Sequence, residues 1–334
     1  MKILVTGGLG FIGSHTVVEL LDNNYEVVVI DNLSNSKIEV VDKIKEITNK
    51  DFTFYKGDLI DKELVDKIFK ENDIEAVIHF AGYKAVGESV QKPLKYYSNN
   101  LGITINLCEI MSKYNVKNII FSSSATVYGN PKKLPIKETF EVGNTTNPYG
   151  ETKLMIERIL KDIYISDNSW NIAILRYFNP IGAHKSSLLG ENPNDIPNNL
   201  MPYIVKVAVG ELDHLNVFGN DYNTIDGTGV RDYIHVVDLA KGHIKALEWT
   251  KKNEGIDYFN LGTGKGTSVL ELVNAFEKYN NVKINYVITE RRKGDIDSCY
   301  ADPSYAKSKL NWESEYTLKD MVIDSYNFVN KNNN

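Results

Sequence analysis

The stretch KILVTGGLGFIGSH, residues 2–15, decides the fold because closely spaced glycines join an apolar run to a helical pattern. The apolar run at its start reads as a buried strand, and residues 11–22 have the spacing of a helix. Between them, Gly7, Gly10 and Gly13 permit a tight turn, let a diphosphate approach the backbone and allow close helix–strand packing. The first turn of the helix presents free N–H groups to the anion. The position of the motif, between a strand and a helix, predicts a dinucleotide site.

Short apolar runs and helical patterns alternate over the first 180 residues. The runs, rich in Val, Ile and Phe as in strands buried on both faces, span 2–6, 26–31, 52–58, 76–82, 117–124 and 171–178. The helical patterns span 11–22, 37–48, 61–71, 93–114 and 149–165. Such alternation predicts an α/β protein with a doubly wound, parallel, Rossmann-like sheet.

The residues that follow the predicted strands refine the dinucleotide site. The second strand ends at Asp31, where a carboxylate accepts from a ribose 2′-hydroxyl and repels a 2′-phosphate, favouring NAD over NADP despite nearby Lys37. Asp58 either binds the adenine amino group or serves only as a turn residue, and the sequence leaves both interpretations open. Phe80–Gly82 and Lys84 follow the fourth strand, at the edge where ligands bind in such folds.

Beyond residue 180 the alternation breaks. A long stretch rich in Asn, Pro and Gly follows, and a loop of that length in a compact domain is typically a binding loop. Further helices are expected at about 236–250, 268–280 and 318–330. We therefore predict an NAD-binding domain over 1–180 and a smaller, loop-rich α/β substrate lobe over 181–334, with some segments returning to the first domain.

Composition excludes several classes of protein. The chain has 334 residues and a formal net charge of −6, which argues against a nucleic-acid or anionic-membrane partner. No run approaches the roughly 18 apolar residues of a membrane span. Cys108 and Cys299 have no paired spacing, and the six histidines form no HxxxH or HxH cluster. We expect a cytoplasmic, metal-free protein in which His79 is a core residue with a hydrogen-bonded ring and Cys108 is also core.

Four tyrosines precede a lysine by four positions, so this spacing alone cannot identify a catalytic pair. The pairs are Tyr128/Lys132, Tyr149/Lys153, Tyr279/Lys283 and Tyr305/Lys309. A proline interrupts the first pair, and the third straddles a predicted helix end. The fourth is helical in pattern but has no strand or glycine loop leading to it.

The Tyr149 pair has the setting of a catalytic site. Asn147 is a good N-cap and Pro148 suits the first helical position, so Tyr149 and Lys153 share a helix face. The preceding strand ends at Ser124, beside which the tyrosine can return. Lowering a phenol pKa from about 10 to about 7 takes roughly 4 kcal/mol. A nearby ammonium supplies about 3–4 kcal/mol at an effective dielectric of about 20, and an oxidised nicotinamide adds a second positive charge. We therefore interpret Tyr149 as a catalytic base rather than a surface residue.

Motifs along nearly the whole chain, about residues 1–330, carry a family resemblance. They are the glycine loop, SSSATVYG, PYGETK, LRYFNPIGAH, IPNNLMPY, GTGVRDYIHV and YFNLGTG. Together they resemble the UDP-glucose (UDP-galactose) 4-epimerases, a branch of the extended short-chain dehydrogenase/reductase family. The resemblance implies that Ser124, Tyr149 and Lys153 are catalytic and that NAD stays bound through turnover. It also implies a homodimer formed through helices at about 93–114 and 149–165.

The resemblance further implies two sets of binding residues. The cofactor set is Gly7, Gly10, Phe11, Ile12, Gly13, Asp31, Asn32, Asn35, Ser36, Asp58, Leu59, Phe80, Ala81, Gly82, Lys84, Asn99, Ser122, Tyr149, Lys153, Tyr177 and Phe178. The substrate set is Lys84, Ser124, Tyr149, Asn179, Asn199, Leu200, Asn216, Val217, Phe218, Arg231, Arg292, Asp295 and Cys299.

The implied reaction interconverts UDP-glucose and UDP-galactose through a 4-keto sugar. Tyr149, as phenolate, takes the proton of the 4-hydroxyl while C4 gives hydride to NAD⁺, and Ser124 hydrogen-bonds the same oxygen. Lys153 also binds the nicotinamide ribose. The keto sugar turns about its diphosphate link and receives hydride on the opposite face, so no net redox change results.

Two features of the substrate set depend on single residues. Arg231 and Arg292 are assigned to the diphosphate, whose oxygens suit a planar guanidinium, although Arg231 could instead pair with Asp232 or Asp295. Cys299 occupies a position similar to the sugar-pocket wall, where some family members carry tyrosine. The smaller thiol leaves room at C2, so we predict that UDP-N-acetylglucosamine and UDP-N-acetylgalactosamine are interconverted too; the alternative is a cysteine that only packs.

Three other functions share this fold. A sugar-nucleotide 4,6-dehydratase needs an acidic pair beside the serine, whereas this chain has Ala125 and Thr126 there. An NAD-dependent sugar-nucleotide reductase would exchange its cofactor in every turnover. An NAD-sensing scaffold could dispense with the tyrosine and lysine, which are intact here.

Overall fold

A seven-stranded parallel sheet forms the centre of the computed structural model, which describes residues 1–194, 199–292 and 294–333. Its strands are β1 Lys2–Thr6, β2 Glu26–Asp31, β3 Thr53–Lys56, β4 Ala76–His79, β5 Asn118–Ser124, β6 Asn171–Tyr177 and β10 Gly255–Leu261. They lie in the order β10-β6-β5-β4-β1-β2-β3, and all neighbours are parallel. The strand order reverses between β1 and β4, which is where ligands bind in such sheets. The predicted doubly wound fold is confirmed.

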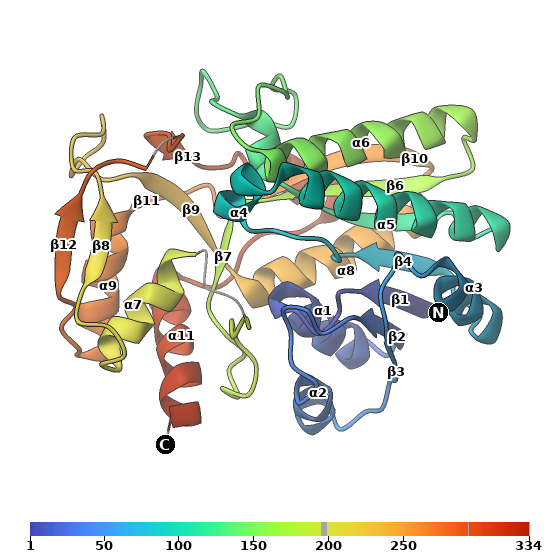
Figure 1. Cartoon of the computed structure of the whole chain (residues 1–334), viewed down its shortest axis with the longest axis horizontal. Helices are drawn as coiled ribbons and strands as arrows, with labels where there is room; N and C mark the ends of the chain where they lie inside the picture. Colours follow the sequence, from blue (N-terminus) through green and yellow to red (C-terminus); the bar gives the residue numbers. More distant parts are fainter. Residues whose placement is uncertain (195–198, 293, 334) are drawn as a thin grey trace.

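Helices cover both faces of this sheet (Figure 1). One face carries α1 Phe11–Asp22, α2 Val40–Thr48, α8 Val236–Lys252 and α10 Ser304–Leu310. The other face carries α3 Lys62–Glu71, α5 Pro93–Lys113 and α6 Pro148–Ser166, with the short α4 Val86–Gln91 beside α5 and α6. Apolar side chains fill the space between the sheet and each helical layer, which is why the strands are apolar on both faces.

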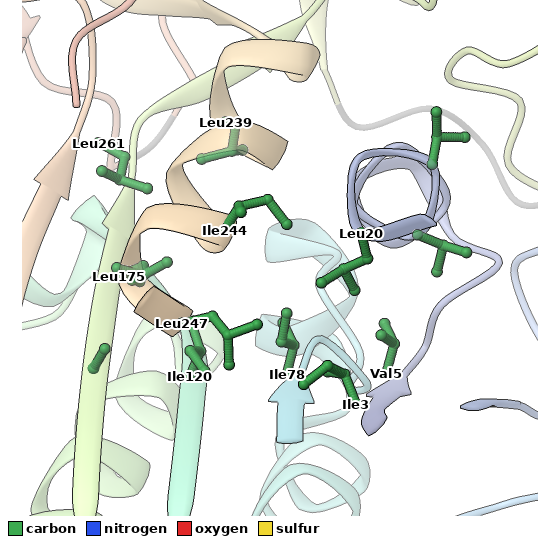
Figure 2. Close-up of a cluster of buried hydrophobic side chains, with 14 of the residues drawn as sticks. Ile3, Val5, Leu20, Ile78, Ile120, Leu175, Leu239, Ile244, Leu247 and Leu261 are labelled. Atoms are coloured by element: carbon green, nitrogen blue, oxygen red, sulfur yellow. The ribbon is translucent and has the colours of Figure 1, made fainter. Parts of the chain in front are cut away.

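The core between the sheet and the α1–α8 layer consists largely of branched aliphatic side chains, several of which Figure 2 shows. Ile78 and Ile120 of the strands are fully buried and lie near Leu20 of α1 and Leu247 of α8. Each such side chain contributes about 1.5–3 kcal/mol by leaving water. This packing holds the amino end of α1 against the carboxyl edge of the sheet, where the glycine loop lies.

Several predicted bounds need correction. The strand predicted at 76–82 ends at His79, and the one predicted at 52–58 covers only Thr53–Lys56. Gly82 has a φ of +148°, so the chain turns away there instead of continuing the strand. The edge strand β10 and helix α8 come from beyond residue 180, yet they complete the sheet and its helical layer. The division at residue 180 stays a prediction.

A second group of elements lies beside the carboxyl edge of the sheet (Figure 1). It consists of β7 Asn179–Ile181, α7 Leu200–Ala208, β8 Leu215–Phe218, β9 Val230–His235, β11 Gly266–Ser268, α9 Val269–Asn280, β12 Tyr286–Thr289, β13 Ser298–Cys299 and α11 Leu318–Asn333. Strand β9 pairs with β7, β11 and β13, while β8 pairs with β12. Helices α7, α9 and α11 share a separate apolar core with these strands.

The buried histidine of β4 behaves as predicted. His79 Nδ1 lies 2.7 Å from Thr6 Oγ1, and its Nε2 lies 3.0 Å from Thr104 Oγ1. Burial lowers the pKa of His79 to about 3, so the ring is neutral. Cys108 is buried in the core, also as predicted. Within the described ranges, no group of three or more His, Cys, Asp or Glu could hold a metal ion, and none of the helices is long and apolar enough to cross a membrane.

Candidate active site

A cavity of about 810 Å³ opens at the carboxyl edge of the sheet, where the loops after β1, β2, β4 and β5 meet. Every residue of the predicted cofactor set except Phe178 lines it. Phe178 is instead buried in an apolar cluster with Tyr128 and Leu154. Neighbouring residues point to opposite sides at the end of β6, so Tyr177 faces the cavity and Phe178 cannot. The Phe178 side chain therefore packs away from the cavity, and any contact of this residue with the cofactor, through its backbone, stays a prediction.

The glycine loop forms a cradle that side chains would fill. Gly7 has a φ of +67°, and a Cβ there would lie 2.9 Å from the Ala81 nitrogen. A Cβ at Gly13 would lie 2.3 Å from the Gly7 carbonyl oxygen. Helix α1 begins just after the loop, so its first N–H groups face the same space. The cradle and the positive end of the helix dipole fit a diphosphate.

Asp31 is held in a fixed orientation at the cavity wall. Its Oδ2 accepts from the Leu9 N–H (3.0 Å), and its Oδ1 accepts from the Leu33 N–H (2.9 Å) and the Ser36 hydroxyl (2.7 Å). A carboxylate has about four acceptor positions, so capacity for one further donor remains. This fits the predicted contact with a ribose hydroxyl.

Asp58 serves as a turn residue, which is one of the two interpretations that the sequence allowed. Its Oδ1 accepts from the Ile60 N–H (3.0 Å), and its Oδ2 accepts from Asn32 Nδ2 (2.8 Å). The side chain still faces the cavity, and its contact with adenine stays a prediction. Lys84 also lines the cavity, and its Nζ lies 3.5 Å from Glu191 Oε1.

Tyr149 and Lys153 share one face of α6, as predicted. Asn147 caps the helix by accepting from the Gly150 N–H (2.9 Å). Lys153 Nζ donates to the Ser122 carbonyl (2.7 Å) and lies 5.9 Å from the centroid of the Tyr149 ring. Both side chains line the cavity.

Burial dominates the electrostatics of this pair. It raises the pKa of Tyr149, and a hydrogen bond with Ser124 offsets the rise only in part. Burial also lowers the pKa of Lys153 to about 8, against the opposing effect of the Glu157 carboxylate. The protein chain without a bound cofactor therefore raises the pKa of the Tyr149 phenol. Lys153 by itself does not produce the lowering that the sequence predicted for it. That an oxidised nicotinamide lowers the pKa of the Tyr149 phenol stays a prediction.

Two of the other tyrosine–lysine pairs lie in ordinary structural surroundings. Lys309 Nζ is also 5.9 Å from the Tyr305 ring centroid, but the Tyr305 hydroxyl donates to Asp257 (2.8 Å). Neither residue lines the cavity. The Tyr128 hydroxyl donates to Asn260 (2.7 Å), and Tyr128 ends a short 3₁₀ turn, η1 Ala125–Tyr128, without a helix toward Lys132.

Three charged residues of the substrate set share one ion-pair cluster. Arg292 Nε lies 2.9 Å from Asp295 Oδ2, and Arg231 lies 3.9 Å from Asp295 Oδ1. Asp295 is thus one of the two alternatives that the sequence left open for Arg231. The other alternative is wrong, because the Asp232 carboxylate accepts from Thr263, Gly264 and Ala301. The guanidinium of Arg292 also lies 5.0 Å from the Phe218 ring centroid.

Apart from Ser124, which ends β5, the substrate residues outside the cavity lining belong to the second group of elements or to the segments that connect them. Outside the cavity lining are Ser124, Asn179, Asn199, Leu200, Asn216, Val217, Phe218, Arg231, Arg292, Asp295 and Cys299. Val217 is buried in the core, so its side chain cannot contact a ligand. Asn199 donates to Glu191 (2.9 Å), the carboxylate beside Lys84. Cys299 pairs with Arg231 across β13 and β9 and packs on the cluster that contains Phe178.

Sequence reasoning missed some of the cavity wall. Residues 188–193 and Phe328 of the last helix also line it. Asn194 fixes the first segment across the cavity, because its N–H donates to Asn35 (3.0 Å) and its Nδ2 donates to the Ser36 carbonyl (3.0 Å). The Asn- and Pro-rich composition did predict a binding loop here. No motif marks Phe328.

Comparison with known proteins finds 4-epimerases of UDP-sugars among the relatives of this chain. Residues 3–262 match the family described as "NAD dependent epimerase/dehydratase family". The chain is 62% identical to the UDP-glucose 4-epimerase of Bacillus subtilis (strain 168), over all of this chain and 98% of that protein. It is similar to the crystal structure of UDP-glucose 4-epimerase from Bifidobacterium longum in complex with NAD⁺ and UDP, with a TM-score of 0.97 and 55% identity over 100% and 99% of the two chains. The structure of the UDP-Glc/GlcNAc 4-epimerase from Campylobacter jejuni has a TM-score of 0.86 and 36% identity, over 99% of each chain.

Proposed function

Because the chain belongs to the NAD-dependent epimerase/dehydratase family, we propose that it is a UDP-glucose 4-epimerase, an NAD-dependent isomerase that interconverts UDP-glucose and UDP-galactose. The observation that carries this proposal is the half-buried Tyr149, hydrogen-bonded to Ser124 and beside Lys153, on the wall of the cavity that the glycine loop lines.

Each residue of this group has a separate task. Bound NAD supplies a reversible hydride acceptor. Tyr149, as phenolate, accepts the proton of the sugar 4-hydroxyl and later returns it. Ser124 donates a hydrogen bond that stabilises the phenolate, and Lys153, fixed by the Ser122 carbonyl, adds positive charge beside the ring. Since the reaction has no net redox change, the protein gains by holding its cofactor through turnover, which the glycine cradle supports.

The second group of elements would bind the UDP-sugar. Arg231 and Arg292 meet at Asp295, and phosphate oxygens suit the guanidinium fork better than a single shared carboxylate does. On this assignment, residues 1–180 hold NAD and residues 181–334 mainly hold the substrate, with β10 and α8 belonging structurally to the first part.

The proposal is tested by an NMR time course with each of the four UDP-sugars and by identification of the nucleotide that co-purifies. UDP-glucose and UDP-galactose should each convert to the same final mixture without added cofactor. A protein that retains NAD but converts neither sugar is not an epimerase for them.

We propose that Cys299 admits N-acetylated substrates. The thiol is packed beside Ala125 and Phe178 in one cluster, and burial raises its pKa to about 11, so it contributes space rather than charge or reactivity. Cys299→Tyr should lower turnover of UDP-N-acetylglucosamine by about 10- to 100-fold and change UDP-glucose turnover much less. Cys299→Ser, of matched size, should keep both activities. Equal N-acetyl activity in Cys299→Tyr and the unaltered protein would show that the thiol only packs.

A homodimer through α5 and α6 is also proposed. The two helices run side by side (Figure 1), and they leave Leu94 (80% exposed), Ile105 (43%) and Ile165 (63%) in contact with solvent. Exposed apolar side chains on neighbouring helices favour association. Sedimentation should give twice the chain mass at micromolar concentration, and Ile105→Lys should shift the protein toward one chain. A monomeric unaltered protein contradicts the proposal.

A cytoplasmic location remains part of the proposal. It is supported by Cys108 and Cys299, both of which are free thiols, as is usual in reducing compartments. Cell fractionation with an antibody to the protein tests it.

A further inference from the structure

The Ser124 hydroxyl receives two hydrogen bonds from a single residue. The backbone N–H of Thr126 lies 3.2 Å from Ser124 Oγ, and the Thr126 hydroxyl lies 3.0 Å from the same atom. A serine hydroxyl has two lone pairs and one proton. With both lone pairs occupied, Ser124 can only donate, and the Tyr149 phenol is its hydrogen-bond partner.

Thr126 also touches the helix that carries Tyr149. A Cβ at Gly150 would lie 3.1 Å from Thr126 Oγ1 and 3.2 Å from Thr126 Cβ. The glycine therefore lets the first turn of α6 approach the η1 turn closely. Thr126 therefore lies against Gly150, the residue after Tyr149, and its hydroxyl is bonded to Ser124. Its methyl group serves packing and its hydroxyl serves hydrogen bonding, so substitution can separate the two.

We infer that Thr126 is a positioning residue of the reaction: its hydroxyl donates to Ser124 and thereby makes Ser124 donate its own proton toward the Tyr149 phenol oxygen. The inference rests on the proposed function of Tyr149 as the base. A donor aimed at the phenol oxygen favours the phenolate, whereas a serine free to accept would favour the protonated phenol.

The direction of the expected pH effect follows from the groups around the phenol. Lys153 on α6, Tyr177 on β6 and Lys84 after β4 line the same cavity, with Glu191 beside Lys84. None of these changes when the Thr126 hydroxyl is removed. Loss of that hydroxyl frees a lone pair of Ser124, so the phenolate loses stabilisation and the Tyr149 pKa rises. Activity that depends on the phenolate should then appear at higher pH.

Thr126→Val and Thr126→Ser test the inference in the NAD-bound protein. Thr126→Val keeps the volume and loses one hydrogen bond, so kcat should fall about fivefold and the KM for UDP-glucose should stay within about twofold. The acid limb of the pH–kcat profile should move up by about 0.7 pH unit. Ultraviolet titration of the phenolate without substrate should show the same shift. Thr126→Ser, which keeps the hydroxyl, should restore both values.

A matched control removes a hydroxyl of the same kind elsewhere. Thr48 is buried in α2, where its hydroxyl donates to the Ile44 carbonyl (2.9 Å) outside the cavity, so Thr48→Val should leave kcat and the titration unchanged. Unaltered kcat and phenol titration in Thr126→Val overturn the inference, as does an equal defect in Thr126→Ser, which would assign the effect to the methyl group. The titration needs no turnover, so it still decides the point if the unaltered protein fails to epimerise UDP-glucose.

Discussion

Tyr149→Phe should lower kcat for UDP-glucose by roughly 10²- to 10⁴-fold, the usual contribution of a positioned acid–base group. The substitution removes one oxygen atom from a half-buried ring beside Lys153 and Ser124. The ring itself remains, so the packing of α6 on the sheet and the shape of the cavity should change little. NAD content and melting temperature should therefore match those of the unaltered protein, and the loss should fall on turnover alone. Saturating UDP-glucose and NMR detection of UDP-galactose give the comparison.

Tyr305→Phe is the matched control for this substitution. Tyr305 has a lysine four residues later at the same distance from its ring, and its hydroxyl also makes a hydrogen bond. It lies outside the cavity, so kcat should stay within about twofold of the unaltered value. Full activity in Tyr149→Phe, or equal losses in both variants, would remove Tyr149 from the chemistry.

The cofactor half of the site could be predicted because its signals are local. The glycine loop, the aspartate at the end of β2 and the Asn147 cap each depend on a few neighbouring residues. A parallel sheet then brings the ends of its strands to one edge without further information. That is why twenty of the twenty-one predicted cofactor residues line one cavity, while the side chain of Phe178 packs away from it because of the side that a single residue faces. Their contacts with NAD stay predictions.

The substrate half depends on pairing between distant short strands, which sequence patterns do not specify. Asn179 pairs with Tyr233, and Cys299 pairs with Arg231, in strands of two to six residues. Such short runs show too few residues for a recognisable period. The assignments made there from resemblance stay predictions.

Two further features have no sequence signal at all. Phe328 comes to the cavity from the other end of the chain, and the donation by Thr126 depends on a single 3₁₀ turn. Only one of the two influences on the Tyr149 pKa could be predicted from the sequence. The spacing to Lys153 is local, whereas the burial that raises the pKa depends on the whole fold.

Gly13→Ala should abolish cofactor retention while most of the fold survives. The new Cβ would lie 2.3 Å from the Gly7 carbonyl oxygen and 2.8 Å from the Gly8 Cα. Both contacts are with backbone atoms, so no side chain can move aside, and the start of α1 must shift away from the glycine loop. A methyl group forced into a filled space costs about 1–3 kcal/mol. If that cost falls on the NAD-bound geometry, NAD affinity drops by as much as roughly 150-fold.

Nucleotide content after gel filtration and fluorescence titration with NAD measure this loss, and kcat at saturating NAD shows what activity remains. Gly87→Ala is the control, since a Cβ at Gly87 meets no atom within 4 Å and the residue lies within α4. It should retain NAD and gain slight stability, because alanine favours a helix over glycine by about 1 kcal/mol. The comparison distinguishes the general effect of an added methyl group from the specific effect of pushing α1 away from the glycine loop. If Gly13→Ala keeps one NAD per chain through the column, the close approach of helix and loop is not what holds the dinucleotide.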